Sequence, residues 1–157
     1  MSSAVPIARL GAAAEVTDLA SLLDREQPID QAFPKCDPGI RPTGSRVLVQ
    51  IRSPKTRTRG GIILAADTTE TEKWNQQVGR VVAAGPVAFR NRNTLDPWPE
   101  GDWVKPGDFV RVPKYGGDRW ERALDAEGRE QALFVIFNDL EIIGVVTVDP
   151  RDIKAFI

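Results

Sequence analysis

Three carboxylates, Asp67, Glu70 and Glu72, lie close together in the sequence, and acidic side chains at such spacing are candidates for acid–base chemistry. The chain has no histidine, which excludes His-based triads, His proton shuttles and His metal sites. Its single cysteine, Cys36, excludes an intrachain disulfide and a Cys-cluster metal site. No nucleophile-elbow, phosphate-loop or dinucleotide-binding motif is present in the sequence. We therefore interpret the three carboxylates as a solvated face, and predict a protein that is not an enzyme and binds no metal or cofactor.

Aromatic and basic side chains offer a second chemistry, because rings interleaved with arginines can stack on the bases of single-stranded nucleic acid. The 157-residue chain has 21 Lys and Arg against 22 Asp and Glu, a formal net charge of −1. That balance lacks the positive excess typical of nucleic-acid binders, although a local patch is compatible with it. Nucleic-acid binding is therefore kept as an alternative. The residues that would form the groove are Phe89, Trp98, Trp103, Trp120, Arg80, Arg90, Arg92 and Arg119.

A short apolar run, Gly60-Gly61-Ile62-Ile63-Leu64, stands in the middle of the polar segment 53–77. This segment is rich in Thr, Lys, Arg, Asp and Glu, and cannot bury enough surface to offset the entropy of ordering it. We therefore predict a long mobile loop over residues 53–77 in the free protein. The alternative is that residues 62–64 simply belong to another strand.

The elements that must position these residues are strands. From residue 46 onward, short runs rich in Val, Ile and Phe are separated by Gly, Pro and Asp, which is typical of a small barrel, and no long helix is available to cover a parallel sheet. Lys105-Pro106-Gly107-Asp108 has the residues of a type II turn, and Asp125–Gly128 would close a hairpin. The predicted class is all-β. The predicted strands are 46–52, 78–84, 109–112, 119–124, 131–137 and 140–148.

Residues 1–40 form a predicted N-terminal extension before the barrel at 41–148. Val16, Leu19, Ala20 and Leu23 make one stripe of a short amphipathic helix, and prolines make 28–42 an extended linker. The extension is either a frayed arm or an arm that docks on a neighbouring subunit or another partner. Residues 86–103 form a rim or roof insertion, and 149–157 a C-terminal tail.

Neither a membrane span nor a targeting signal is predicted. The apolar runs are far shorter than the roughly 18 residues that a spanning helix needs. Glu15 and Asp18 interrupt the apolar core that a signal peptide requires. We expect a cytoplasmic protein.

The order of motifs over about residues 40–146 resembles the co-chaperonins, the GroES or ten-kilodalton chaperonin family. The similarity rests on an opening strand, a Gly-Gly-aliphatic loop tip, the strand after it, a Val-Lys-x-Gly-Asp strand entry and a closing acid–aliphatic strand. A Tyr-Gly pair also falls where the family has one. The matching residues are Ile40-Arg41-Pro42 with Arg46-Val47-Leu48-Val49, Gly60-Gly61-Ile62-Ile63-Leu64, Gly79–Gly85, Val104–Val110, Tyr115-Gly116 and Asn138–Val146. The long extension, the tail and the unfamiliar segment around Trp98 are similar to the additions of divergent bacteriophage-encoded members.

The resemblance implies a seven-membered ring of GroES-like β-barrels that caps a GroEL-type chaperonin around an unfolded client protein. Gly60 to Leu64 would dock on the chaperonin, and Tyr115 would face the chamber or, as an equally open reading, pack in its turn. Residues 46–52 would pair with the neighbour's 140–148 to close the ring, unless these two strands pair within one barrel. ATP would be bound by the partner, in the host cytoplasm if the chain is phage-encoded, with neither nucleic acid nor membrane involved. A virion structural protein built on the same barrel is a further alternative.

Overall fold

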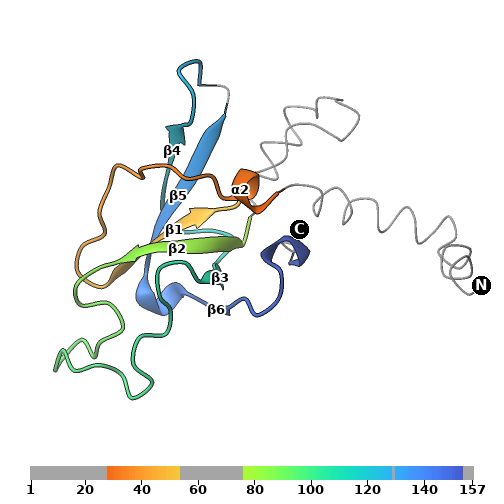
Figure 1. Cartoon of the computed structure of the whole chain (residues 1–157). Coiled ribbons are helices and arrows are strands. Elements are labelled where there is room, and N and C mark those ends of the chain that lie inside the picture. Colours follow the sequence, from red (N-terminus) through yellow and green to blue (C-terminus); the bar gives the residue numbers. More distant parts are fainter. Residues whose placement is uncertain (1–27, 54–75, 129, 154–157) are drawn as a thin grey trace, which may run out of the picture.

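The computed structural model describes residues 28–53, 76–128 and 130–153 of the chain, and these residues are mostly strand, as predicted for an all-β protein (Figure 1). Six strands form one antiparallel sheet in the order β4-β5-β1-β2-β3-β6. Helical structure in the described ranges is limited to single turns: α2 (Ile29–Ala32), η1 (Asp139–Glu141) and η2 (Pro150–Asp152). The strands are β1 (Arg46–Ile51), β2 (Val78–Ala84), β3 (Phe109–Arg111), β4 (Asp118–Ala123), β5 (Gln131–Asn138) and β6 (Gly144–Val145).

Strand β1 lies in the interior of the sheet, because it pairs with β5 along one edge and with β2 along the other. Every residue of β1 after Arg46 is buried, including the polar side chain of Gln50. The alternation of Val47, Val49 and Ile51 with Arg46, Leu48, Gln50 and Arg52 in the sequence predicts a half-buried strand, with one face in water. That prediction is wrong because residues 28–38 of the extension cover the second face, which carries Leu48 and Gln50.

The two faces of the sheet support separate hydrophobic clusters. The inner cluster, the larger one, brings alternate residues of β1 and β5 together with Phe89, Val104 and Ile142, and Trp98 and Trp103 pack against it. On the outer face, Leu48, Ala132 and Phe134 are fully buried beneath half-buried Cys36 and Trp120. Burial of both faces explains how strands with little helix around them sustain a core.

Gly79 of β2 is required by the close approach of β1. A Cβ atom at this position would lie 2.9 Å from the carbonyl oxygen of Gln50 and would also clash with Cγ1 of Val49. We therefore expect Gly79→Ala to lower the free energy of unfolding by roughly 1–3 kcal/mol, as for other overpacked cores. Urea unfolding would measure it, with Ala84→Val as the control, because Ala84 is exposed at the other end of the same strand. Equal midpoints for the two variants would contradict this reading.

Local turn chemistry matches the sequence predictions at two places. At residues 105–108, Asp108 N–H donates to the Lys105 carbonyl at 3.0 Å and Gly107 has φ +99°. This is the positive φ that a type II turn requires at its third residue. The predicted hairpin is also confirmed, since β4 pairs with β5 from Asp118↔Ile136 to Ala123↔Gln131.

Two predicted elements differ from the structure. The expected strand over 140–148 is reduced to the two residues of β6, because the chain first makes the turn η1, closed by a capping box between Asn138 and Glu141. The expected extended linker over 28–42 is wrong at its start, where α2 forms and Phe33 is buried. The predicted helix around residues 16–23 lies outside the described residues. In the described part of the chain, no helix is long and apolar enough to cross a membrane.

Candidate functional site

The predicted docking residues, Gly60 to Leu64, lie outside the described residues, but the two points where segment 54–75 joins the sheet are described. The segment leaves after Ser53, just beyond β1, and returns at Gln76, just before β2. Because Ile51 pairs with Gly79, both roots lie at the same end of the same pair of strands. The fold therefore places both roots of segment 54–75 at one end of the sheet.

The first root is held by four different segments. Ser53 N–H donates to the Ala32 carbonyl at 2.8 Å, and Ser53 Oγ donates to the Gln131 carbonyl at 3.3 Å. Arg52 N–H donates to the Val78 carbonyl at 3.3 Å, and its guanidinium reaches the Arg151 carbonyl at 3.4 Å. The extension, β2, β5 and the chain after β6 thus all contact the point where the segment departs.

The second root is tied to β3. Val112 N–H donates to the Gln77 carbonyl at 2.9 Å, and the Gln77 amide returns a hydrogen bond to the Val112 carbonyl at 3.3 Å. Arg111 donates to the other amide atom of Gln77, at 3.3 Å. Backbone and side chain together fix Gln77, so the second root is also held by hydrogen bonds.

Residues 28–38, here called the strap, run along the outer face of the sheet beside the first root. Phe33 is buried at 1% exposure, with its ring centroid 5.0 Å from that of Phe109. At the far end of the strap, the indole N–H of Trp120 donates to the Pro38 carbonyl at 2.8 Å, and Arg122 donates to the Asp37 carbonyl at 3.1 Å. The strap is therefore fastened at both ends.

Buried Gln50 and half-buried Arg80 hold the middle of the strap. The Gln50 side-chain amide donates to the Pro34 carbonyl at 2.6 Å, while its oxygen accepts from Arg80 at 2.7 Å. Arg80 also donates to the Phe33 carbonyl at 3.3 Å. Since Gln50 is 1% exposed, losing either partner would leave a buried polar group unsatisfied, which is costly.

Tyr115 lies on the turn between β3 and β4 and is 75% exposed, so its ring does not pack in that turn. Arg119 of β4 holds the turn from both sides of Tyr115, donating to the Lys114 carbonyl at 3.3 Å and to the Gly116 carbonyl at 3.2 Å. The guanidinium lies 5.9 Å from the Phe137 ring centroid, and burial lowers the pKa of Arg119. The turn is fixed, and the tyrosine projects from it.

The insertion at 86–103 is a structured hairpin, closed by a bridge between Arg90 and Pro97, at the opposite end of the sheet from α2 (Figure 1). It is attached through Asp139, which is fully buried. One carboxylate oxygen of Asp139 accepts from Phe89 N–H at 2.7 Å, and the other accepts from Leu140 N–H at 2.8 Å. Arg92 of the hairpin forms an ion pair with the same carboxylate. This network was not predicted from sequence.

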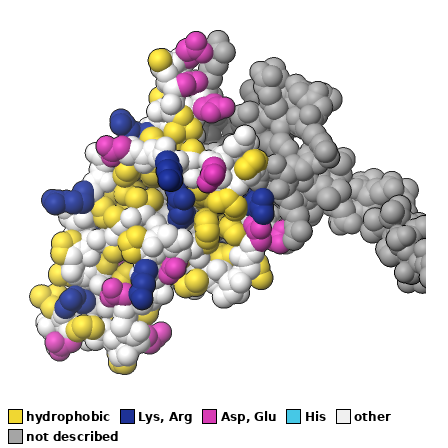
Figure 2. Space-filling view, in the orientation of Figure 1, with side chains coloured by type: hydrophobic (Ala, Val, Ile, Leu, Met, Phe, Trp, Pro, Cys, Tyr) yellow, Lys and Arg dark blue, Asp and Glu magenta, His cyan; other side chains and the backbone are white. Residues whose placement is uncertain are grey.

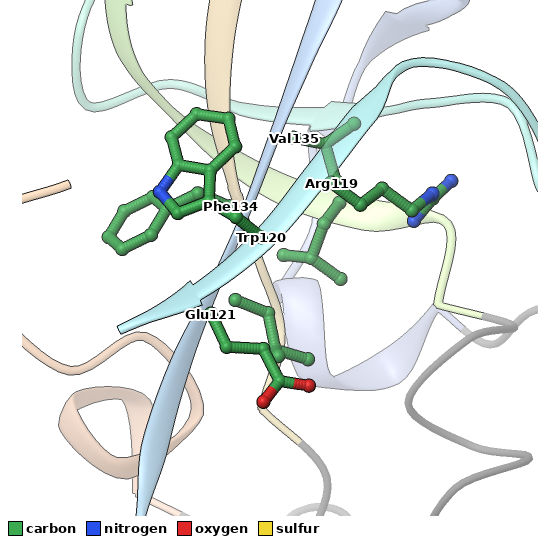
Figure 3. A pocket seen from close by; sticks show the side chains of 7 residues that line it. Arg119, Trp120, Glu121, Phe134 and Val135 are labelled. Carbon is green, nitrogen blue, oxygen red and sulfur yellow. The ribbon is translucent and has the colours of Figure 1, made fainter. Parts of the chain in front are cut away.

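The aromatic and basic residues of the nucleic-acid alternative do not form one groove. Phe89, Trp98 and Trp103 pack in the inner cluster, whereas Trp120 stacks on Phe134 on the outer face, 5.8 Å between centroids. Figure 3 shows Trp120 and Phe134 together on one side of β4, with Arg119 extending from the other. On the face drawn in Figure 2, basic and acidic side chains are interspersed. The arginines that were candidates for this groove hold protein carbonyls and carboxylates.

The family model of the Chaperonin 10 Kd subunit matches residues 39–146, more than half of the chain. The chain belongs to this family. It is 33% identical over 110 residues to the Co-chaperonin GroES of Caulobacter vibrioides, covering 68% of the chain and 96% of that protein. It is 30% identical over 107 residues to the Co-chaperonin GroES of Tetragenococcus halophilus, covering 68% and 98%. A match to the chloroplastic 20 kDa chaperonin of Arabidopsis thaliana has 24% identity over 138 residues, 87% of the chain and 49% of that protein.

The Chaperonin 10 family match begins at residue 39, so the strap precedes it. The only sequence signals of the strap were Phe33 within a proline-rich stretch and Gln50 within an apolar strand. Neither residue belongs to a repeating pattern of apolar residues with the period of a helix or a strand. The sequence of the strap therefore predicts a linker. Among the described residues, no group of three or more Cys, Asp and Glu is placed to hold a metal ion.

Proposed function

We propose that the chain is a cytoplasmic co-chaperonin whose ring caps a GroEL-type chaperonin and encloses an unfolded client protein while the partner hydrolyses ATP. The observation that carries the proposal is the position of the two residues that flank segment 54–75, Ser53 and Gln76, which lie within the 39–146 family match and at one end of β1 and β2. The segment's Gly60-Gly61-Ile62-Ile63-Leu64 sequence supports docking by an apolar tip. Tyr115, exposed on its fixed turn, is proposed to face the chamber.

The expected energetics suit a lid that must dissociate in each cycle. Burying three aliphatic side chains contributes roughly 5–9 kcal/mol gross, at about 1.5–3 kcal/mol each. Ordering about six loop residues costs on the order of 6–12 kcal/mol. One loop should therefore bind weakly, whereas several loops on one ring bind together through high effective concentration.

Ring closure through residues 46–52 is wrong for this chain, because both edges of β1 are already paired within the subunit. We propose β6 as the ring-forming edge instead. Ile143, Val145 and Val148 are each about half exposed or more around this two-residue strand. The opposite edge strand, β4, carries charged residues that disfavour edge-to-edge pairing.

Val145→Asp is therefore expected to convert the ring to monomers, because a charge on this edge would have to be buried in the subunit interface. Native mass measurement of the purified protein would show it. Ala123→Asp, on the exposed end of β4, provides the matched control and should leave the ring intact. An intact ring with Val145→Asp would refute the assignment of the β6 edge.

The proposed function is tested by size-exclusion chromatography with a purified GroEL-type chaperonin. Co-elution that requires ATP or ADP supports the proposal. Failure to co-elute under any nucleotide condition, together with salt-dependent retention on a single-stranded DNA column, would favour the nucleic-acid alternative.

A further inference from the structure

The first root of the proposed docking segment is held by a part of the chain that the family match does not include. The match begins at residue 39, and the strap consists of residues 28–38. The Ala32 carbonyl accepts the backbone N–H of Ser53 at 2.8 Å, on the last described residue before the segment. The strap therefore contacts the docking segment at its point of departure.

The part of the strap that binds Ser53 is itself held in place by packing and hydrogen bonds. Ala32 and Phe33 are buried with Val78, and Ile29, Phe109 and Ile153 pack around them. Just along the strap, Gln50 and Arg80 hold the carbonyls of Phe33 and Pro34. The same small cluster thus joins the strap, both roots of the segment and the chain after β6.

We propose that the strap is a positioning element for the docking loop, and that it raises affinity for the chaperonin by fixing Ser53. This inference rests on the proposed function. Residues that are already ordered in the free protein lose no conformational entropy when the loop docks. If the root were released, docking would have to order additional residues. Each additional residue would weaken the affinity of a single loop for the chaperonin on the order of tenfold.

The chain carries its own reporters of strap and root. Cys36, the single thiol, lies in the strap and packs half-buried against the outer cluster, so its reaction rate with a thiol reagent measures opening of the strap. Lys55 follows Ser53 closely in the sequence, so the rate of tryptic cleavage after Lys55 measures loosening of the root. Both readouts work without the chaperonin.

The experiment compares two strap variants with a control at the strap's other end. Phe33→Ala removes the ring that packs on Phe109, and Gln50→Leu removes the side-chain hydrogen bonds of Gln50 while keeping similar volume, in case the first variant folds poorly. Trp120→Phe removes the hydrogen bond to the Pro38 carbonyl, far from Ser53, and keeps an aromatic ring on Phe134. For each variant, Cys36 reactivity, cleavage after Lys55, native ring mass and affinity for a purified GroEL-type chaperonin with ATP are measured.

For Phe33→Ala or Gln50→Leu, we expect an unchanged ring mass, faster cleavage after Lys55 and chaperonin affinity at least tenfold weaker. Trp120→Phe should speed the reaction of Cys36 with the thiol reagent. It should change neither the rate of cleavage after Lys55 nor the affinity for the chaperonin by more than a small amount. Equal affinity in all four proteins, or the same loss with Trp120→Phe as with Phe33→Ala, would overturn the proposal. If the unaltered protein itself does not bind the chaperonin, the proposed function fails, and the cleavage rates still decide whether the strap fixes the root.

Discussion

Ile63→Asp is expected to abolish capping of an ATP-loaded chaperonin while leaving the ring assembled. The substitution would place a carboxylate where the proposed contact buries an aliphatic side chain, and desolvating an unpaired charge costs several kcal/mol. Because every subunit of the ring carries the same change, the penalty repeats at each loop and the combined binding is lost. Substrate refolding by the chaperonin, followed with and without the variant, measures the effect.

Two controls separate the apolar contact from general effects of charge in the loop. Ile63→Val keeps a β-branched aliphatic and should weaken capping only modestly, since it removes a single methylene. Thr68→Asp adds the same charge to the same segment outside the triplet and should cap normally. Undiminished refolding with Ile63→Asp would contradict docking through this triplet.

Asp139→Ala is expected to have the largest effect on stability. Its carboxylate is fully buried, accepts the backbone N–H groups of Phe89 and Leu140, and pairs with Arg92. Removing the carboxylate leaves the buried N–H of Phe89 without an acceptor, which costs about 1–3 kcal/mol, and the charge-assisted bonds to Leu140 and to exposed Arg92 are lost in addition. Denaturant unfolding should show a loss of this size, accompanied by loosening of the 86–103 hairpin that Asp139 attaches.

Asp118→Ala offers a matched control, because Asp118 is an exposed carboxylate at the start of β4. Its loss should change the free energy of unfolding by less than about 0.5 kcal/mol, as is usual for surface substitutions. A comparable loss from both variants would mean that charge balance, rather than the buried network, carries the effect.

Most of the sheet could be predicted from sequence because its signals are local. The strand over 78–84 has the predicted bounds, and β1, β3, β4 and β5 lie within a residue or so of theirs. Gly85-Pro86 ends β2 and Pro106-Gly107 turns the chain into β3, and the backbone geometry at those residues does not depend on distant parts of the chain.

The elements that were missed depend on tertiary contacts. No residue near Phe33 in the sequence predicts that its ring packs against Phe109, which lies far along the chain. Likewise, the run Leu140–Val148 is apolar enough for a long strand, yet only Gly144 and Val145 pair with β3. The central position of β1 could not be read from its alternation either, because a covering segment such as the strap leaves no periodic trace.

In the candidate site, too, the parts with local sequence signals could be predicted, whereas the parts that depend on tertiary contacts could not. The Gly-Gly-aliphatic motif drew attention to residues 60–64 from composition alone, and they remain a prediction. The anchoring of the roots at Ser53 and Gln77 required coordinates, because it joins the extension, β3 and β5. Gly116 and Gly117 indicate a turn beside Tyr115, but the exposure of the tyrosine depends on how Arg119 holds that turn.

The central claim, a ring that caps a chaperonin, is tested most directly by native mass spectrometry of the full chain with a GroEL-type chaperonin, with and without ATP. We predict a free ring of seven subunits and, with ATP, a complex whose mass equals the chaperonin plus one or two such rings. A monomer that never adds mass to the chaperonin in either condition would contradict the account.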